Sequence, residues 1–107
     1  MATVESASAL LSEREGSLAA FCQRWQISEL ALFGSALRAE FAPDSDIDLL
    51  VDFSPGADWS LFDHLRMEAE LRAILGREVD LVSRRAVEGS PNSIRRREIL
   101  GTAQVIF

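Results

Sequence analysis

The sequence predicts an α/β fold of the α+β type, in which a small mixed sheet is flanked by helices. Three apolar runs, at 30–33, 46–53 and 78–82, have the length and composition of short strands. Between them lie stretches whose apolar residues recur at three- and four-residue spacing, which is typical of helices. This alternation indicates a layered sheet-and-helix architecture. At 107 residues, the chain is expected to form a single domain over 1–107.

The strands are bounded by turn-forming residues. The run 30–33 stops at Gly34, and Pro43 with the two residues after it supplies a turn before the strand 46–53. The strand-pairing order does not follow from this pattern. Three residues at the end of the chain, 105–107, are expected to be a short extended piece.

Four segments are predicted to be helices: about residues 4–25, 36–41, 61–75 and a last one that starts near Ser90-Pro91. The third has the clearest ends, because Ser60 and Asp63 have the spacing of a capping box and Gly76 stands at the C-cap. Its core side is predicted to carry Leu61, Phe62, Leu65, Ala69 and Ala73.

Composition and charge restrict the functional classes. The net charge of −6 argues against sequence-blind nucleic-acid binding, which needs a basic surface, so direct nucleic-acid binding is not expected. Two arginine groups, 84–85 and 95–97, are read as solvated faces, with contact to a partner or to RNA as the alternative. The lone Cys22 implies no disulfide, and neither a signal peptide nor a bilayer-spanning stretch is visible. A cytoplasmic protein without membrane contact is the expectation.

Three aspartates lie in the two most strand-like segments, although aspartate is depleted in strands. Asp46 and Asp48 should project to one side of their strand, and Asp80 would join them if the two strands are neighbours. Carboxylates placed this closely repel one another unless a cation compensates them. We therefore expect Asp46, Asp48 and Asp80 to be catalytic residues and metal ligands for Mg²⁺, with two ions favoured.

The pair Gly34-Ser35 follows a buried strand ten residues before the acids. Glycine lets the backbone approach a ligand closely, and the amides that follow can face an anion. Ser35 adds a hydroxyl donor, and Arg38 lies one helical turn further on. Gly34, Ser35 and Arg38 are thus predicted to bind the phosphates of a nucleotide, although a solvated face is an equal alternative for Arg38.

The runs LFGSALR at 32–38 and PDSDIDLLVDF at 43–53 resemble the minimal nucleotidyltransferase branch of the polymerase-β-like superfamily. The resemblance extends over essentially the whole chain. It implies the minimal polymerase-β-like fold, with ATP as substrate. It places the phosphate-binding pair on Gly34 and Ser35, the two main metal ligands on Asp46 and Asp48, and the third carboxylate on Asp80. Family members often end in a tyrosine where this chain has Phe107.

Members of that family resemble protein adenylyltransferases that act as antitoxins beside a HEPN-domain ribonuclease toxin. Some of these antitoxins neutralise the toxin by adding AMP to one of its tyrosines. The expected function is therefore Mg²⁺-dependent transfer of AMP from ATP to a hydroxyl of a partner protein. The alternative is a binding module that neutralises its toxin by occlusion, without chemistry. A third reading, an RNA 3′-end nucleotidyltransferase, is disfavoured by the acidic charge.

Overall fold

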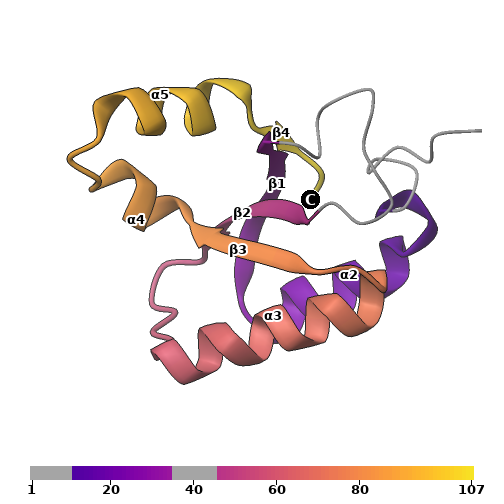
Figure 1. Cartoon of the computed structure of the whole chain (residues 1–107). Coiled ribbons are helices and arrows are strands. Elements are labelled where there is room, and N and C mark those ends of the chain that lie inside the picture. The colour runs from indigo at the N-terminus through magenta and orange to yellow at the C-terminus, as the bar shows by residue number, and fades with distance from the viewer. Residues whose placement is uncertain (1–10, 35–45) are drawn as a thin grey trace, which may run out of the picture.

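The computed structural model describes residues 11–34 and 46–107, and Figure 1 shows the arrangement of their helices and strands. In chain order the elements are α2 (Glu15–Arg24), β1 (Ile27–Phe33), β2 (Ile47–Phe53), α3 (Leu61–Leu75), β3 (Val79–Ser83), α4 (Arg84–Glu88), α5 (Ser93–Thr102) and β4 (Gln104–Val105). The predicted helix 36–41 lies outside the described residues. No helix in the described ranges is long and apolar enough to cross a bilayer.

The four strands form one mixed sheet in the order β3-β2-β1-β4. β1 pairs antiparallel with both β2 and β4, whereas β2 and β3 run parallel. The α+β class with a small mixed sheet is confirmed. The parallel pairing also makes β2 and β3 neighbours, which is the condition on which the predicted grouping of acids depended.

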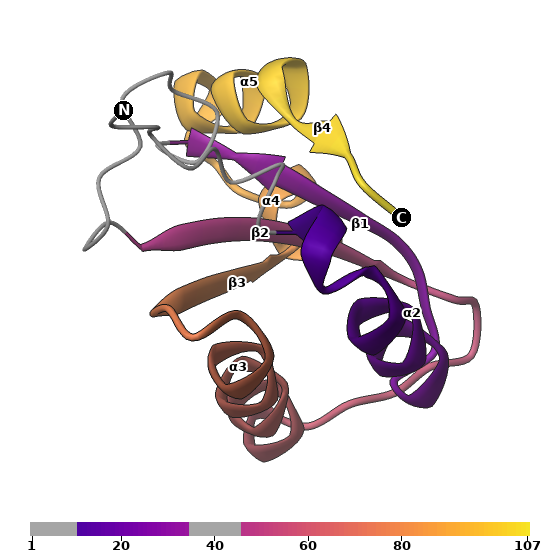
Figure 2. The same ribbon diagram turned by 90° about the vertical axis from the view of Figure 1, so that its right-hand side faces the viewer.

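Helices cover the two faces of the sheet. α2 and α3 lie on one face, and α4 and α5 lie on the other (Figure 2). The larger core, on the α2/α3 side, takes the inward residues Ile47, Leu49 and Val51 of β2. A smaller core on the α4/α5 side includes Leu50, which points the opposite way, as strand alternation requires.

The ends of α3 are those that the sequence predicts. The Ser60 hydroxyl accepts from the Asp63 backbone N–H, and the Asp63 carboxylate accepts from the Ser60 backbone N–H. Gly76 ends the helix with a left-handed φ of 68°, a conformation that glycine adopts without steric cost.

The predicted core side of α3 is wrong. The buried residues are Met67, Leu71 and Leu75, whereas every residue of the predicted stripe is exposed: Leu61, Phe62, Leu65, Ala69 and Ala73. The helix carries apolar residues around most of its circumference, so two apolar stripes compete. Contact with α2 and β3 decides which stripe is buried.

The remaining differences concern element boundaries. The first predicted helix is interrupted by a turn at Arg14, close to Gly16, and α4 was not predicted. At the opposite end of the chain, the extended piece pairs with β1: the Leu30 backbone N–H donates to the Phe107 carbonyl. Cys22 is buried in the larger core.

Candidate active site

The site is built on the register of the two parallel strands. Asp48 of β2 and Asp80 of β3 are direct partners in the ladder. Partners in a parallel ladder point to the same face of the sheet, and neighbouring strands lie about 4.8 Å apart. The two carboxylates, which we call the carboxylate pair, therefore stand side by side. β1 adds Phe33 to the same row, because Phe33 is the antiparallel partner of Asp48.

The carboxylate pair lies on the α4/α5 face of the sheet, at the end where β2 and β3 begin. The adjacent row on that face is apolar, since the next register pair is Leu50 with Val82. Asp48 is half-buried and Asp80 is exposed. The pair thus forms a polar row at the end of the sheet, next to an apolar row that belongs to the smaller core.

Asp46 immediately precedes β2 and is exposed. It is two residues before Asp48, so an extended backbone places both on one side of the chain. The described residues contain no group of three or more histidine, cysteine, aspartate or glutamate side chains positioned to hold a metal ion. The structure therefore brings Asp48 and Asp80 together, and the predicted metal ligation by all three aspartates stays a prediction.

Gly34 contacts the site directly. Its φ of 66° lies in the left-handed region. A Cβ atom built on residue 34 would stand 2.5 Å from Oδ2 of Asp48, closer than any non-bonded contact allows. Glycine therefore suits this position for two reasons: it adopts the left-handed backbone without steric cost, and it leaves the space that the Asp48 carboxylate occupies. Ser35 and Arg38, the other predicted phosphate-binding residues, lie outside the described residues.

The donor set suits a hard cation. Magnesium is bound in proteins by one or two carboxylates together with substrate phosphates and water. Asp48 and Asp80, adjacent on one face, supply such a pair of oxygen donors. The residues present thus fit Mg²⁺, and Asp46 lies two residues before Asp48 on the same strand end.

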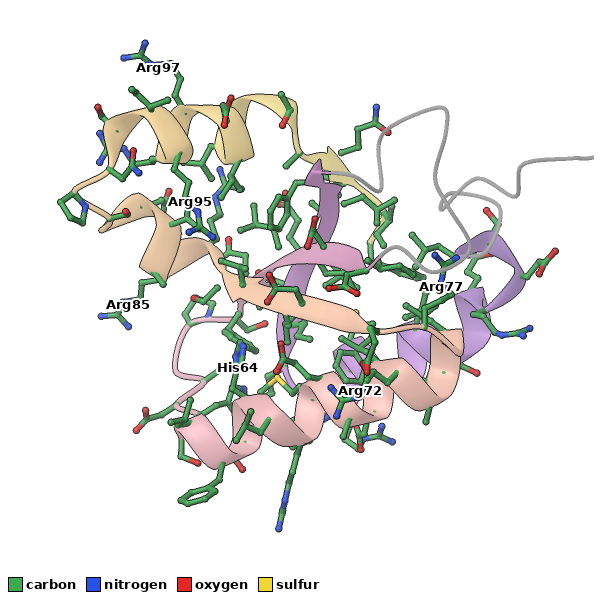
Figure 3. All side chains as sticks on the ribbon, viewed as in Figure 1. His64, Arg72, Arg77, Arg85, Arg95 and Arg97 are labelled. Carbon is green, nitrogen blue, oxygen red and sulfur yellow. The ribbon has the colours of Figure 1, made fainter. Side chains whose placement is uncertain are left out.

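A basic residue that sequence analysis did not single out lies at this end of the sheet. Arg77 lies two residues before β3 (Figure 3). The first residue of β3, Val79, pairs with Ile47 at the start of β2. A guanidinium here can offset carboxylate or phosphate charge. The signal available in the sequence was its position three residues before Asp80.

His64 and Arg85 lie at the other end of the strands (Figure 3). They line a cavity of about 210 Å³ with Ser83, the last residue of β3. The His64 ring nitrogen Nε2 donates to the Leu81 carbonyl oxygen at 2.6 Å. This hydrogen bond joins α3 to β3.

Comparison with known proteins identifies the family. The model of the nucleotidyltransferase domain family matches residues 15–102, which is most of the chain. The chain belongs to this family. A protein adenylyltransferase, MntA of Thermococcus cleftensis, is 33% identical over 100 residues, which cover 94% of this chain and 96% of that protein.

Solved structures show the same fold. One described as a minimal nucleotidyltransferase superposes with a TM-score of 0.69 at 35% identity, covering 96% of this chain and 98% of that one. A toxin–antitoxin complex with AMP-PNP has a TM-score of 0.68 at 19% identity, covering 87% and 72%. A complex of tri-AMPylated Shewanella oneidensis HEPN toxin with its MNT antitoxin has a TM-score of 0.61 at 17% identity, covering 90% and 71%. The chain therefore has the minimal nucleotidyltransferase fold.

Proposed function

We propose that this nucleotidyltransferase transfers AMP from ATP to a hydroxyl group of a partner protein, acting in the cytoplasm as the antitoxin of a HEPN-type ribonuclease toxin. The observation that carries the proposal is the register of Asp48 with Asp80 beside the glycine turn at Gly34. The relative that is 33% identical over nearly the whole chain is a protein adenylyltransferase, which supports a protein acceptor. The fold is shared with toxin–antitoxin complexes, one of which holds an AMPylated HEPN toxin.

In the proposed reaction, the acceptor oxygen attacks the α-phosphorus of ATP. A new phosphorus–oxygen bond forms, and the bond from the α-phosphorus to the bridging oxygen breaks. Pyrophosphate leaves with the bonding electrons, and the acceptor keeps AMP as a phosphodiester. Asp80 is exposed at the edge of the sheet, so it can accept the hydroxyl proton.

The remaining residues position the substrate. Gly34 and Ser35 would bind the β- and γ-phosphates through backbone amides and a hydroxyl, and Arg38 would add a cation. Asp46, Asp48 and Asp80 would hold Mg²⁺, up to two ions, which when bound neutralises charge on the phosphates and the leaving oxygen. The apolar row of Leu50 and Val82 beside the pair offers no competing polar group.

The test uses ATP labelled on the α-phosphate, Mg²⁺ and the HEPN-domain partner. Label should reach the partner with the wild-type chain and not with the double variant Asp46→Asn/Asp48→Asn. Asp52→Asn is the matched control, because Asp52 lies on β2 four residues after Asp48 and about 13 Å along the strand. Label transfer by the double variant at the wild-type rate would refute the proposal.

The second candidate is occlusion, in which binding alone neutralises the toxin. The observation that favours it is the exposed apolar surface on α3, where Leu61 and Phe62 are 74% and 79% exposed. The same double variant separates the two candidates. If it transfers no AMP and still neutralises the ribonuclease fully, neutralisation is by occlusion. If ribonuclease activity returns, neutralisation depends on the chemistry.

A further inference from the structure

β3 is an edge strand, because β2 lies on one side of it and no strand of the described residues pairs with its other side. The Ile47 backbone N–H donates to the Glu78 carbonyl at 2.8 Å, so every second residue from 78 onward directs its backbone groups to β2. The residues between them, including Leu81, direct theirs to the open edge. Leu81 is 3% exposed, so its N–H and C=O need partners within the protein.

α3 supplies both of these partners, since it runs alongside β3 (Figure 1). Oε2 of Glu68 accepts from the Leu81 backbone N–H at 2.9 Å, and Nε2 of His64 donates to the Leu81 carbonyl at 2.6 Å. The two side chains are four residues apart, so they lie on one side of the helix. They present an acceptor and a donor to the edge of β3, as a further strand would. We call these two hydrogen bonds the edge clamp.

The Glu68 bond acts on the peptide unit that joins Asp80 to Leu81. The carbonyl of this unit belongs to Asp80 and points to β2, whereas its N–H belongs to Leu81 and points to Glu68. The unit is trans and planar, so its C=O and N–H point in opposite directions. Hydrogen bonds on both sides therefore fix the rotation of this plane. They thereby fix the direction in which the Asp80 side chain leaves the backbone.

Asp80 depends on this backbone control more than Asp48 does. Asp48 lies on a strand that is paired on both sides, and its carboxylate occupies the space beside Gly34. Asp80 is exposed on the edge strand, and no hydrogen bond or ion pair in the described part of the chain holds its carboxylate. Its position beside Asp48 is therefore set by the register and tilt of a five-residue strand.

We propose that Glu68 is a positioning residue for the AMP transfer proposed above, on which this inference rests. Through the edge clamp it holds the peptide unit after Asp80, so that the Asp80 carboxylate stays beside Asp48 and binds the same cation. α3 covers the face of the sheet opposite the carboxylate pair, so Glu68 acts through the backbone and not on the metal or the substrate (Figure 2). His64 completes the clamp by holding the following peptide unit.

The first measurement follows the backbone and needs no catalytic activity. Hydrogen exchange observed by NMR should show a protected Leu81 amide in the wild-type chain, as expected for a bonded and buried N–H. Glu68→Ala removes the acceptor and should speed exchange of that amide at least about tenfold, whereas the Leu32 amide in the middle of the sheet should not change. Glu68→Gln keeps an amide oxygen as acceptor and should keep the protection.

The second measurement is the affinity for Mg²⁺. Calorimetry uses Mg²⁺ with an ATP analogue that carries a methylene group between the α- and β-phosphates, so that AMP is not transferred. Glu68→Ala should weaken Mg²⁺ binding about tenfold, which is the usual cost of losing a group that orients a metal ligand. Glu68→Gln should stay within about threefold of the wild type, because a neutral acceptor bonds less strongly than a carboxylate. The rate of AMP transfer should follow the same order.

Glu70→Ala is the matched control. Glu70 lies on the same helix, but its Oε2 accepts from Trp25 and Arg24 and not from β3. This variant should lose stability and keep the Mg²⁺ affinity of the wild type, which a general loss of stability in α3 cannot imitate. Circular dichroism verifies that each variant folds. Should Glu68→Ala fail to fold, Glu68→Asp replaces it, since it keeps the charge and shortens the reach to Leu81.

The inference fails if Glu68→Ala leaves either the exchange of the Leu81 amide or the Mg²⁺ affinity unchanged. It also fails if Glu70→Ala weakens Mg²⁺ binding equally, or if the wild-type chain binds no Mg²⁺ beside the analogue. Failure of the proposed function gives a different result. The wild-type chain would then bind Mg²⁺ with the analogue, and Glu68→Ala would bind it more weakly, but no AMP would reach the HEPN-domain partner.

Discussion

The Asp48 carboxylate occupies the space that a side chain at Gly34 would need. The gap from an added Cβ to Oδ2 of Asp48 would be 2.5 Å. Asp48 is also the ladder partner of Asp80. A change at Gly34 therefore reaches the carboxylate pair through one contact, and this relationship connects the predicted phosphate turn with the predicted metal ligands.

Gly34→Ala should reduce AMP transfer by about tenfold or more, since a left-handed conformation costs a residue with a Cβ about 1–2 kcal/mol and the Asp48 carboxylate must also move. The measurement is the single-turnover rate with labelled ATP. Gly56→Ala is the control: its φ is 91°, but an added Cβ meets nothing within 4 Å. That variant should lose stability only, and an equal loss of transfer in both variants would contradict the role given to the Asp48 contact.

Ser60→Ala should lower the free energy of unfolding by about 1 kcal/mol, because it removes the side-chain half of the capping box of α3. Urea unfolding at neutral pH measures the loss. Transfer activity should be unchanged, since Ser60 lies at the other end of the sheet from the carboxylate pair.

The same cap should make stability depend on pH. Hydrogen bonds from the backbone and then the hydroxyl of Ser60 lower the pKa of Asp63 below its ordinary value of 3.8. A depressed pKa stabilises the fold above pH 3.8, and this contribution is lost as the pH falls further. The difference between wild type and Ser60→Ala should therefore shrink on acidification below pH 3.8. A difference that grows there would contradict the assignment.

Glu70→Ala should destabilise the fold by about 1–3 kcal/mol, because it leaves the indole N–H of Trp25 without its acceptor. Trp25 is 9% exposed and packs edge-on against Trp59 at a centroid distance of 5.0 Å. Tryptophan fluorescence during unfolding reports the loss. Glu78→Ala is the control, since its ion pair with Arg72 is exposed and should contribute less than about 1 kcal/mol.

Cys22 should react slowly with thiol reagents in the native protein. Burial raises the pKa of the Cys22 thiol from 9.0 to about 11, which lowers the thiolate fraction near pH 8 about hundredfold. Labelling with a chromogenic disulfide should accelerate at least that much in urea. Equal rates in both conditions would show that α2 does not protect the thiol.

Much of the local structure was predictable because it depends on neighbouring residues. The span of α3 follows from its cap residues Ser60 and Gly76, and the strand character of β2 follows from the alternation of Ile47, Leu49 and Val51. Such signals act over a few residues and need no knowledge of the fold. The helix α4 was not predicted, because its five residues directly after a strand give too short a pattern to recognise as a helix.

Two features of the molecule depended on the tertiary structure. The residues of α3 offer two apolar stripes, and the one with Met67 and Leu71 is buried because α2 and the sheet pack against that side. The acids Asp48 and Asp80 are far apart in the chain, and only the parallel ladder makes them neighbours. The sequence by itself predicted which residues would carry the chemistry, and it determined where most of the described helices and strands lie, since those depend on side-chain type and short-range spacing. Which of these residues face one another depends on long-range packing, because the packing of helices and strands decides which side of each element is buried and which is exposed.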